Sequence, residues 1–446
     1  MGAVLRPSVI FQERPLSPKT FRLTAIFLLL GAFVLLAACQ STASDEAQSV
    51  TFMVSGDPAE LAAYEALVDS FHAATDNIEV SITYVASGKD FREKLATMFS
   101  GGIPPDVFLY NYRRLGDFAA AAAVHPIDDL LDASTVLNRE DFYPITLNAF
   151  TYQGALQCLP QNLSSPVIYY NQALFDAAGL AYPAAGWTRA DFLAAARALT
   201  RDLDGDGVTD QWGFGTEIET IRLAPFLWQN GGDFLDDPAN PTALTLDTPE
   251  ARAAIQWFVD LQMVEHVTPD LVAETTQSSE DRFLNGTVAM FMNSRVAVPA
   301  LRTITAFAWD AAPLPDDGTP ASVLHSDAFC MSAKAAEDAA HLAAAWTFIE
   351  YSLSETGQTL LAETGRTVPS MIRVAESQAY LGSTLPDNGQ AWLDAADHMR
   401  ALPMIPGWNT FEELFTKELQ RAFYGDITVD ELITGADEIA APLFAP

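Results

Sequence analysis

Four aspartates stand close together in one short acidic segment. They are Asp202, Asp204, Asp206 and Asp210, at positions one, three, five and nine of a loop whose sixth residue is Gly207. Carboxylates at this spacing, with glycine at the sixth position, are typical of loops that bind calcium. Position twelve is Gly213 instead of the usual bidentate glutamate. We therefore predict either a structural calcium ion or an acidic surface turn without one, and we expect that no other cofactor is required.

Catalytic motifs are absent from the sequence. It contains neither Gly-x-Ser-x-Gly nor His-Glu-x-x-His. Its six histidines are scattered, with His72 and His341 in helical patterns and His125 and His325 in connectors. Since 58 residues are acidic, pairs of carboxylates arise by chance and carry little weight. We predict that the protein is not an enzyme, and a hydrolase is the main alternative class.

Residues 1–38 have the parts of a signal peptide. Basic residues, namely Arg6, Arg14, Lys19 and Arg22, precede an uncharged, leucine-rich run from Leu23 to Ala38. This run is shorter than the ~20 residues that comfortably span a bilayer. It ends in Leu36-Ala37-Ala38-Cys39, which resembles the bacterial lipobox, so we expect Cys39 to be lipidated and residues 39–48 to form a tether. A single N-terminal transmembrane anchor is the alternative, and both interpretations export the rest of the chain.

Charge and length restrict the partners and the architecture. The net charge of −34 argues against nucleic acid or an anionic lipid surface as a partner. With 49% hydrophobic residues, the chain is expected to fold. About 400 residues follow the tether, enough for two lobes of ordinary size. Besides Cys39, the chain has only Cys158 and Cys330, which we expect to be buried thiols, with a single disulfide as the alternative.

The elements that would position polar side chains follow an α/β order. Strands are predicted at 51–54, 78–84 and 107–110, separated by helices that begin after Asp57 and at about Lys89. Asp57, Pro58 and Glu60 have the spacing of a capping box with proline at the first helical position. Such apolar strands alternating with helices predict a parallel sheet covered on both faces. Further helices are expected at 188–199, 249–264, 335–351 and 410–423.

Several short motifs follow in an order that resembles a known family, the family 1 extracellular solute-binding proteins of ABC importers, which includes maltose-binding protein. The motifs are Ser55-Gly56-Asp57, Pro105-Asp106-Val107, Tyr169-Tyr170-Asn171 through Leu174-Phe175, Phe283 through Met290, Gly365 through Pro369, and Pro406-Gly407-Trp408. The resemblance implies a type II periplasmic-binding-protein-like fold with two α/β lobes, crossover strands and a ligand cleft. Lobe I would hold 49–162 plus 312–352, and lobe II 163–311 plus 353–446.

The resemblance also implies a function. We expect a monomer that captures a sugar or oligosaccharide outside the membrane and delivers it to ABC permease subunits. The lipid on Cys39 would hold it at the outer face of the cytoplasmic membrane. An exported carbohydrate-active hydrolase, a same-fold receptor for a polyol or glycerol phosphate, and a surface lipoprotein without ligand remain alternatives.

Ligand-binding residues are expected where loops converge at the cleft, because sugars need aromatic surfaces for ring faces and planar polar groups for hydroxyls. In or near lobe I we select Ser55, Asp57, Tyr110, Asn162, Ser164 and Asp327. Asp57 could instead only cap its helix, and Tyr110 could be a core residue.

The expected contacts from lobe II combine aromatic, amide and guanidinium groups. We select Trp228, Asn230, Gly232, Arg295, Arg366 and Trp408. Trp228 has a buried helix-end position as its alternative, whereas Trp408 is expected to be an exposed platform in a Pro/Gly loop. Arg295 stands where the resembled family often has an aromatic residue, which keeps an acidic sugar open as the ligand.

Overall fold

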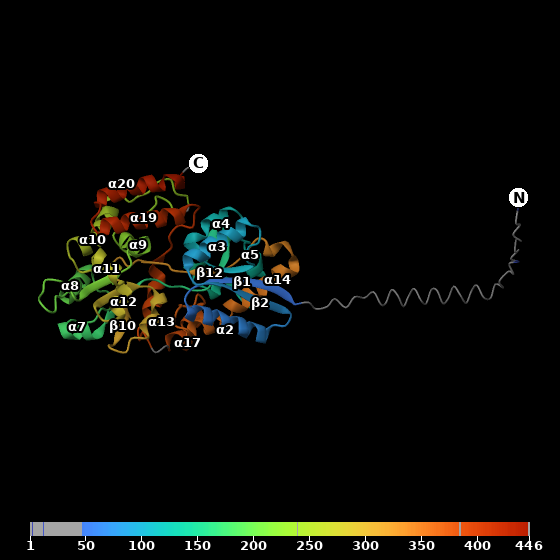
Figure 1. Ribbon diagram of the computed structural model, residues 1–446, viewed down its shortest axis with the longest axis horizontal. Coiled ribbons are helices and arrows are strands. Elements are labelled where there is room, and N and C mark those ends of the chain that lie inside the picture. Colours follow the sequence, from blue (N-terminus) through green and yellow to red (C-terminus); the bar gives the residue numbers. More distant parts are fainter. Residues whose placement is uncertain (1, 3–11, 13–46, 239, 383–384, 445–446) are drawn as a thin grey trace. The chain divides into compact units, whose positions relative to one another are not determined.

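The computed structural model describes residues 47–238, 240–382 and 385–444, together with Gly2 and Gln12. The predicted signal peptide, apart from those two residues, and Cys39 lie outside the described residues. Residues from Gln48 onward form one unit with two main sheets, each covered by helices (Figure 1), and two small two-stranded sheets. Within the described residues, no helix has the length and apolarity needed to cross a membrane.

Lobe I is built on a five-stranded sheet in the order β2-β1-β3-β12-β6. Its strands are β1 (Gln48–Ser55), β2 (Ile78–Val85), β3 (Val107–Asn111), β6 (Cys158–Pro160) and β12 (Asp327–Met331). The first three are parallel, as predicted, whereas β12 runs antiparallel between β3 and β6. The sheet is buried because its strands are apolar and because α2 (Pro58–Ala74), α3 (Gly88–Ser100) and α14 (Ala339–Leu353) pack against it.

Helix α2 begins where the sequence indicates. Asp57 caps it by accepting a hydrogen bond from the backbone N–H of Glu60 at 2.9 Å, and Pro58 is its first residue. The helix buries Tyr64, Leu67 and Phe71 at helical spacing against the sheet. The carboxylate of Glu60 is therefore presented in the first turn, beside the end of β1.

Lobe II has a four-stranded sheet in the order β10-β7-β9-β8. Its strands are β7 (Val167–Asn171), β8 (Trp212–Thr216), β9 (Val288–Asn293) and β10 (Trp309–Ala312). Strands β8 and β9 are parallel, and β7 is antiparallel to both of its neighbours. The main helices of this lobe are α8 (Arg189–Leu199), α9 (Thr220–Gln229), α10 (Pro249–Met263), α12 (Ser279–Leu284), α19 (Trp408–Phe423) and α20 (Val429–Ala440).

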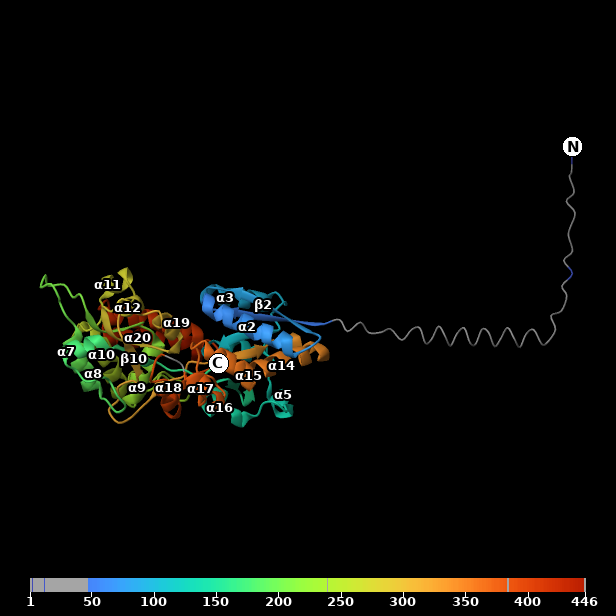
Figure 2. The ribbon, with the colours of Figure 1, turned by 90° about the horizontal axis from the view of Figure 1, so that it is seen from below.

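The two lobes are separate in both ribbon views, with α7 to α12 on one side and α2, α3, α5 and α14 on the other (Figures 1 and 2). Three extended segments cross between them and touch one another through bridges that pair Asn162 with Pro369 and Ser164 with His325. We refer to these connecting segments as the hinge region. The α/β, two-lobed architecture expected from the sequence is confirmed.

Two features of lobe I differ from the expectations. Helix α15 (Glu355–Glu363) follows the proposed boundary at 353, yet it packs against α2 and α14 and so lies with lobe I. Cys158 and Cys330 form a disulfide between β6 and β12, so the expectation of two thiols is wrong. The physical reason is that these residues face each other in the antiparallel register of the two strands, which sequence separation hides.

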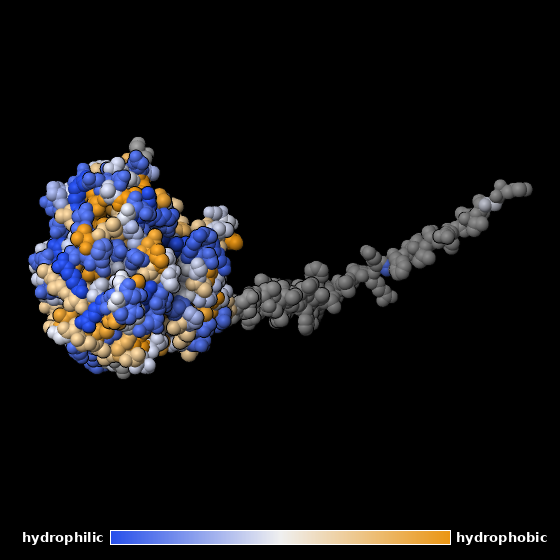
Figure 3. Space-filling model, turned by 60° about the vertical axis from the view of Figure 1, so that its left-hand side comes forward, coloured by the Kyte–Doolittle hydropathy of each residue, from blue (hydrophilic) through white to orange (hydrophobic). Residues whose placement is uncertain are grey.

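Shorter elements complete the fold. They are η1 (Tyr112–Arg114), α4 (Gly116–Ala120), α5 (Asp128–Ala133), η2 (Arg139–Asp141), α6 (Pro144–Ala149), β4 (Thr151–Tyr152), β5 (Ala155–Leu156), α7 (Gln172–Ala178), α11 (Leu271–Thr276), η3 (Arg295–Ala297), α13 (Val298–Leu301), β11 (Ser322–Val323), η4 (Ala335–Glu337), α16 (Ile372–Ala375), α17 (Gln378–Leu381), α18 (Gln390–Ala395), η5 (Ala396–His398), β13 (Met399–Arg400) and η6 (Ala441–Phe444). On the face in Figure 3, hydrophobic residues form scattered patches among hydrophilic ones.

Candidate ligand cleft

The candidate site lies where parallel strands of both lobes end. Strands β1 and β3 of lobe I end at Ser55 and Asn111, and β8 and β9 of lobe II end at Thr216 and Asn293. In α/β folds, ligands bind outside the carboxyl ends of such strands, where loops and helix N-termini meet. Charged and amide side chains gather at these ends in three connected clusters, with the crossovers between them.

The first cluster is centred on Arg366 in a crossover. Its Nη1 lies 2.5 Å from Asp57 Oδ2, and its Nη2 lies 2.8 Å from Glu60 Oε2. The Tyr64 hydroxyl also donates to Glu60 Oε1 at 3.3 Å. Asp57 therefore both caps α2 and holds the guanidinium, whereas Glu60 turns toward Arg366 instead of completing the expected capping box.

The environment of Glu60 perturbs its titration. The pKa of its carboxyl is raised to about 7, chiefly by burial; the charge of Arg366 opposes this rise, and the nearby carboxylates of Asp327 and Asp57 add to it. Gly56 permits this approach, because a Cβ there would lie 1.7 Å from Glu60 Oε2 and its φ of 141° suits glycine. Glu60 thus holds its proton to a higher pH than an ordinary glutamate does.

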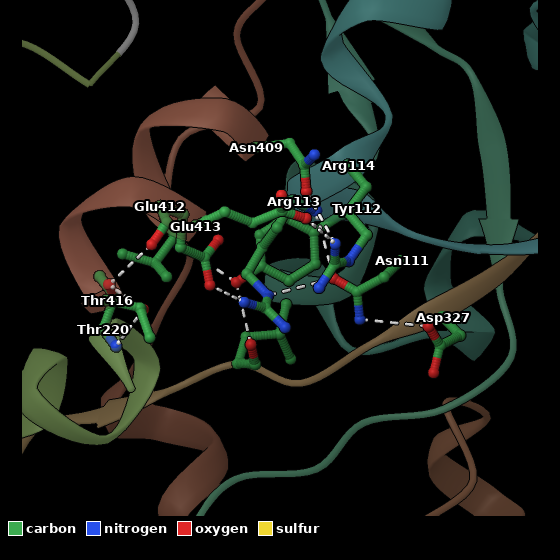
Figure 4. A network of polar contacts seen from close by, with 12 residues as sticks. Asn111, Tyr112, Arg113, Arg114, Thr220, Asp327, Asn409, Glu412, Glu413 and Thr416 are labelled. Atoms are coloured by element: carbon green, nitrogen blue, oxygen red, sulfur yellow. Dashed lines mark hydrogen bonds and ion pairs between the residues drawn. The ribbon is translucent and has the colours of Figure 1, made fainter. Parts of the chain in front are cut away.

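The second cluster joins the lobes (Figure 4). Asn111 donates to Asp327 Oδ1 at 3.1 Å, and its own Oδ1 accepts from Arg113 Nε at 3.2 Å. Arg113 extends from lobe I to a close ion pair with Glu412 of α19. Both side chains of this pair are largely buried, being 13% and 11% exposed, so the contact is shielded from solvent.

Arg114 adds a more exposed contact to the second cluster. Its Nη1 donates to Asn409 Oδ1 at 2.8 Å, and it lies 3.3 Å from Glu413, whose side chain is 50% exposed. Lobe I therefore reaches the first turn and a half of α19 through two neighbouring guanidinium groups, one buried and one at the surface.

The third cluster is centred on Arg222 in the first turn of α9. Its Nη2 donates to Glu217 Oε2 at 2.6 Å and to Asn293 Oδ1 at 2.5 Å. Its Nε and Nη1 have no hydrogen-bond partner among the described residues, although the residue is only 3% exposed. Buried donors are normally paired, so these two nitrogens are candidates for contacts with ligand or water.

His325 connects the third cluster to the second. Its Nε2 is buried, and no group within the described ranges forms a hydrogen bond with it. Burial lowers the pKa of its ring well below the usual value, and the charges of Arg222 and Arg113 lower it further. The ring is therefore neutral at physiological pH, and the charge of one guanidinium from each lobe acts on it.

A cavity continues from the third cluster along lobe II. It has a volume of about 610 Å³ and begins at the end of β8, where Thr216, Glu217 and Glu219 line it. Its far wall comes from α19 and the following turn, with Gln420 and Tyr424. The cavity thus offers carboxylate, amide, hydroxyl and aromatic groups in a space large enough for a small saccharide.

The structure brings several of the predicted ligand residues to this region. Asp57, Asn162, Ser164, Asp327 and Arg366 all belong to the clusters or the crossovers, and Ser55 ends β1. Asn162 and Ser164 mainly hold the crossovers together. Asn162 Oδ1 accepts from the Asp327 N–H, and Ser164 Oγ accepts from the Arg295 N–H.

Arg295 occupies the hinge and is fully buried. Its guanidinium lies over the rings of Tyr380 and Trp392, at 4.4 and 4.8 Å from their centroids. It donates to the Gly365 carbonyl at 2.9 Å and to the Tyr380 hydroxyl at 3.1 Å. This conformation assigns Arg295 to fixing the crossover segments rather than to a cleft surface.

The predicted aromatic platforms lie in the core. Trp408 is 0% exposed and packs against Phe234 and Phe411, so the expectation that it is exposed is wrong. The neighbouring proline and glycine residues suggested an exposed loop, but Trp408 is the first residue of α19 and its side chain is buried. Trp228 is buried at the end of its helix, which was the alternative to a ligand platform, and its Nε1 donates to Asp233 at 3.0 Å. Tyr110 likewise packs among Phe91 and other rings of lobe I.

Asn230 and Gly232 make structural contacts at the end of α9 in this conformation and do not form a ligand surface. Asn230 donates to the Glu250 carbonyl and accepts from Arg189. At Gly232, a Cβ would lie 2.8 Å from the backbone of Ala251, so only glycine fits there.

The acidic loop brings together three of its four predicted ligands. Oxygen atoms of Asp202, Asp204 and Asp210 lie within 4.8 Å of one another, all on exposed residues. Asp206 is not in this group, and its carboxylate accepts from the Val208 N–H. Asp202 accepts from the N–H groups of Gly205 and Gly207, which lowers its pKa. A calcium ion at this loop stays a prediction.

Sequence reasoning missed several cleft residues. They are Glu60, Asn111, Arg113, Glu217, Arg222, Asn293 and Glu412. Asn111, Glu217 and Asn293 stand at or just after the last residue of a buried strand, which is a usable signal. Arg222 gave no such signal, because it lies in the otherwise apolar helix α9.

Comparisons with known proteins give consistent results. A family model described as bacterial extracellular solute-binding protein matches residues 55–359. A Brucella abortus protein named as a binding protein is 23% identical over 355 residues, covering 77% of this chain and 80% of its own length. A maltotriose-binding protein of Pyrococcus abyssi is 20% identical over 258 residues, covering 58% of this chain and 51% of its own.

A solved structure extends the likeness to nearly the whole fold. An ABC substrate-binding protein from Listeria monocytogenes, in complex with cycloalternan, superimposes with a TM-score of 0.80 at 23% identity. The superposition covers 89% of this chain and 99% of that one. At this level of identity the likeness establishes the two-lobed architecture.

Proposed function

Since the chain belongs to the bacterial extracellular solute-binding protein family, we propose that it is the substrate-binding component of an ABC importer for a sugar or oligosaccharide. Two of its relatives carry saccharides in their names or titles, maltotriose and cycloalternan. The ligand would lie between the lobes, in contact with the strand ends and with the cavity beside Glu217. Closure of the lobes around it would produce the form that permease subunits recognise.

The observation that carries this proposal is the third cluster. Arg222 is buried with two free nitrogen donors, and Glu217 and Asn293 hold its remaining nitrogen in place. Planar guanidinium, carboxylate and amide groups at fixed positions suit the hydroxyls of a sugar, which both donate and accept. Asn111 and Asp327 offer the same types of group from lobe I.

Charge favours a neutral sugar over an anionic one. Arg113, Arg222 and Arg366 each already contact a carboxylate. The three clusters contain six carboxylates and four guanidinium groups. The carboxylates are those of Asp57, Glu60, Asp327, Glu217, Glu412 and Glu413, and the guanidinium groups are those of Arg113, Arg114, Arg222 and Arg366. An anionic ligand such as a uronate or a glycerol phosphate would have to overcome this excess of negative charge. Arg222 is the group that would hold such a ligand.

The placement of the protein in the cell is also part of the proposal. The family is extracellular, so the mature chain is exported. We infer that Cys39 carries the lipid that anchors a monomer to the outer face of the cytoplasmic membrane, with residues 1–38 removed. Labelling of expressing cells with an alkyne fatty acid should mark the wild-type protein and leave Cys39→Ala unmarked. Equal labelling of the variant would contradict the lipid anchor.

The binding function is tested by titration calorimetry of residues 40–446 with mono- and oligosaccharides, a uronate and glycerol 3-phosphate. We expect one-to-one binding of a neutral sugar, with no new product detected by mass spectrometry. Arg222→Met should weaken it at least tenfold, because a charged hydrogen bond is worth about 1.5–3 kcal/mol. Arg373→Met, at a side chain of α16 that is 50% exposed, is the matched control. If none of the compounds in the panel binds, a sugar ligand is rejected. Detection of a cleaved product would indicate a hydrolase.

A further inference from the structure

A second cavity lies beside the hinge, apart from the three clusters. It has a volume of about 370 Å³, and none of the residues of the three clusters lines it. Its walls come from the start of β7, the segment after β10, the end of α9 and helix α18. Most of the lining is apolar, with proline, alanine, valine and leucine side chains such as Pro313 and Leu314.

At this cavity, two buried polar atoms have no hydrogen-bond partner in the part of the chain that the structure describes. Gln229 is 7% exposed and its Oε1 is unpaired, while Ser322 is 5% exposed and its Oγ is unpaired. The amide of Gln229 is oriented by its Nε2, which donates to the Ala321 carbonyl at 3.2 Å, so Oε1 is the free acceptor. Because Ser322 follows Ala321 directly, the two free oxygens belong to adjacent parts of one wall.

Unpaired buried polar atoms in a native fold call for an explanation, since leaving one unsatisfied costs free energy. Both atoms can accept a hydrogen bond, and the residues that carry them line a space large enough for a small organic molecule. The missing partner is therefore a donor, supplied by a ligand or by water.

The charge around the cavity selects the ligand further. Asp316 and Asp394 lie among the lining residues, whereas lysine and arginine do not; His398 is the one basic residue there. The whole protein also carries a net charge of −34. Anions are therefore disfavoured, and a cation is attracted.

From these observations we propose that the hinge cavity binds a small aliphatic ammonium compound. The ammonium group would donate to Gln229 Oε1 and Ser322 Oγ, the two carboxylates would balance its charge, and the apolar walls would contain its hydrocarbon part. This site is independent of the proposed sugar cleft.

The probe is n-butylammonium, with n-butanol and butyrate as controls of the same length. Binding to residues 40–446 is measured by calorimetry and by saturation-transfer NMR. We expect saturable binding of butylammonium, weaker binding of butanol and none of butyrate. Ser322→Ala removes only an unpaired hydroxyl, so it should leave the thermal midpoint unchanged and weaken binding roughly tenfold.

A second pair of variants tests the location. Ala395→Leu places a larger side chain in the cavity from α18 and should abolish binding, whereas Ala396→Leu, at the adjacent residue outside the lining, should retain it. Absence of butylammonium binding, equal binding of butyrate, or binding that both Ser322→Ala and Ala395→Leu retain would each overturn the proposal. In those cases water alone supplies the missing hydrogen bonds of the two free oxygens.

Discussion

Replacement of Glu60 by glutamine should make the protein more stable at alkaline pH. In the wild type, burial raises the pKa of this carboxyl from 4.5 to about 7, although Arg366 lies 2.8 Å away. The folded state therefore holds the proton more tightly than the unfolded state does. The stability that this provides is complete below pH 4.5 and is lost as the pH rises through 7.

The magnitude follows from the two pKa values. Each tenfold change in proton affinity corresponds to 1.36 kcal/mol, so ionising Glu60 in the folded protein costs roughly 3 kcal/mol. The side chain is only 18% exposed, so solvent screens little of this effect. Glutamine resembles the protonated form and does not titrate, and Arg366 keeps its contact with Asp57 in the variant.

The assay is urea denaturation of wild type and Glu60→Gln at pH 5, 7 and 8.5. We expect similar free energies of unfolding at pH 5, and an advantage of roughly 3 kcal/mol for the variant at pH 8.5. Glu65→Gln on the exposed side of α2 controls for the change in net charge and should follow the wild type. Parallel curves for Glu60→Gln and wild type over the whole range would refute the reasoning.

Three further predictions concern other parts of the chain. Glu412→Gln removes the carboxylate of a buried ion pair and should lower the free energy of unfolding by about 3 kcal/mol. In the same denaturation assay, Glu413→Gln at the exposed neighbouring pair should lower it by less than about 1 kcal/mol. Equal effects of the two variants would contradict the assigned burial. Combined replacement of Cys158 and Cys330 by alanine opens a link across a sequence separation of 172 and should lower the free energy of unfolding by about 3 kcal/mol; an unchanged denaturation midpoint would show that the bond does not contribute. If the acidic loop binds calcium, 1 mM calcium should raise the thermal midpoint of the wild type but not of Asp202→Asn, with magnesium as the control; identical shifts in both proteins would reject this loop as the site.

The fold was largely predictable because its signals are local. The first five elements of lobe I follow from strand and helix periodicity and from the cap at Asp57, and the structure contains them within a few residues. The antiparallel return of β12 between β3 and β6, and with it the disulfide, depends on contacts between residues far apart in the chain. No local pattern specifies such a pairing.

The site was predictable only in part. Residues directly after buried strands, such as Asp57, were found because strand ends converge on the cleft. Trp228 and Trp408 were selected for their residue type, but a tryptophan near glycine can equally complete a core, and here both do. Arg222 was missed for the opposite reason, since its helix is mostly apolar and its partner Glu217 lies outside that helix.

The most direct test of the account is hydrogen exchange with and without the sugar that calorimetry identifies. If the ligand is clamped between the lobes, peptides containing Asn111 and Asp327 of lobe I and Glu217 and Asn293 of lobe II should all become protected. Peptides of α20 and α5, which lie away from the clusters, should not change. Protection confined to one lobe, or absent from all four peptides at saturating sugar, would contradict capture in the cleft.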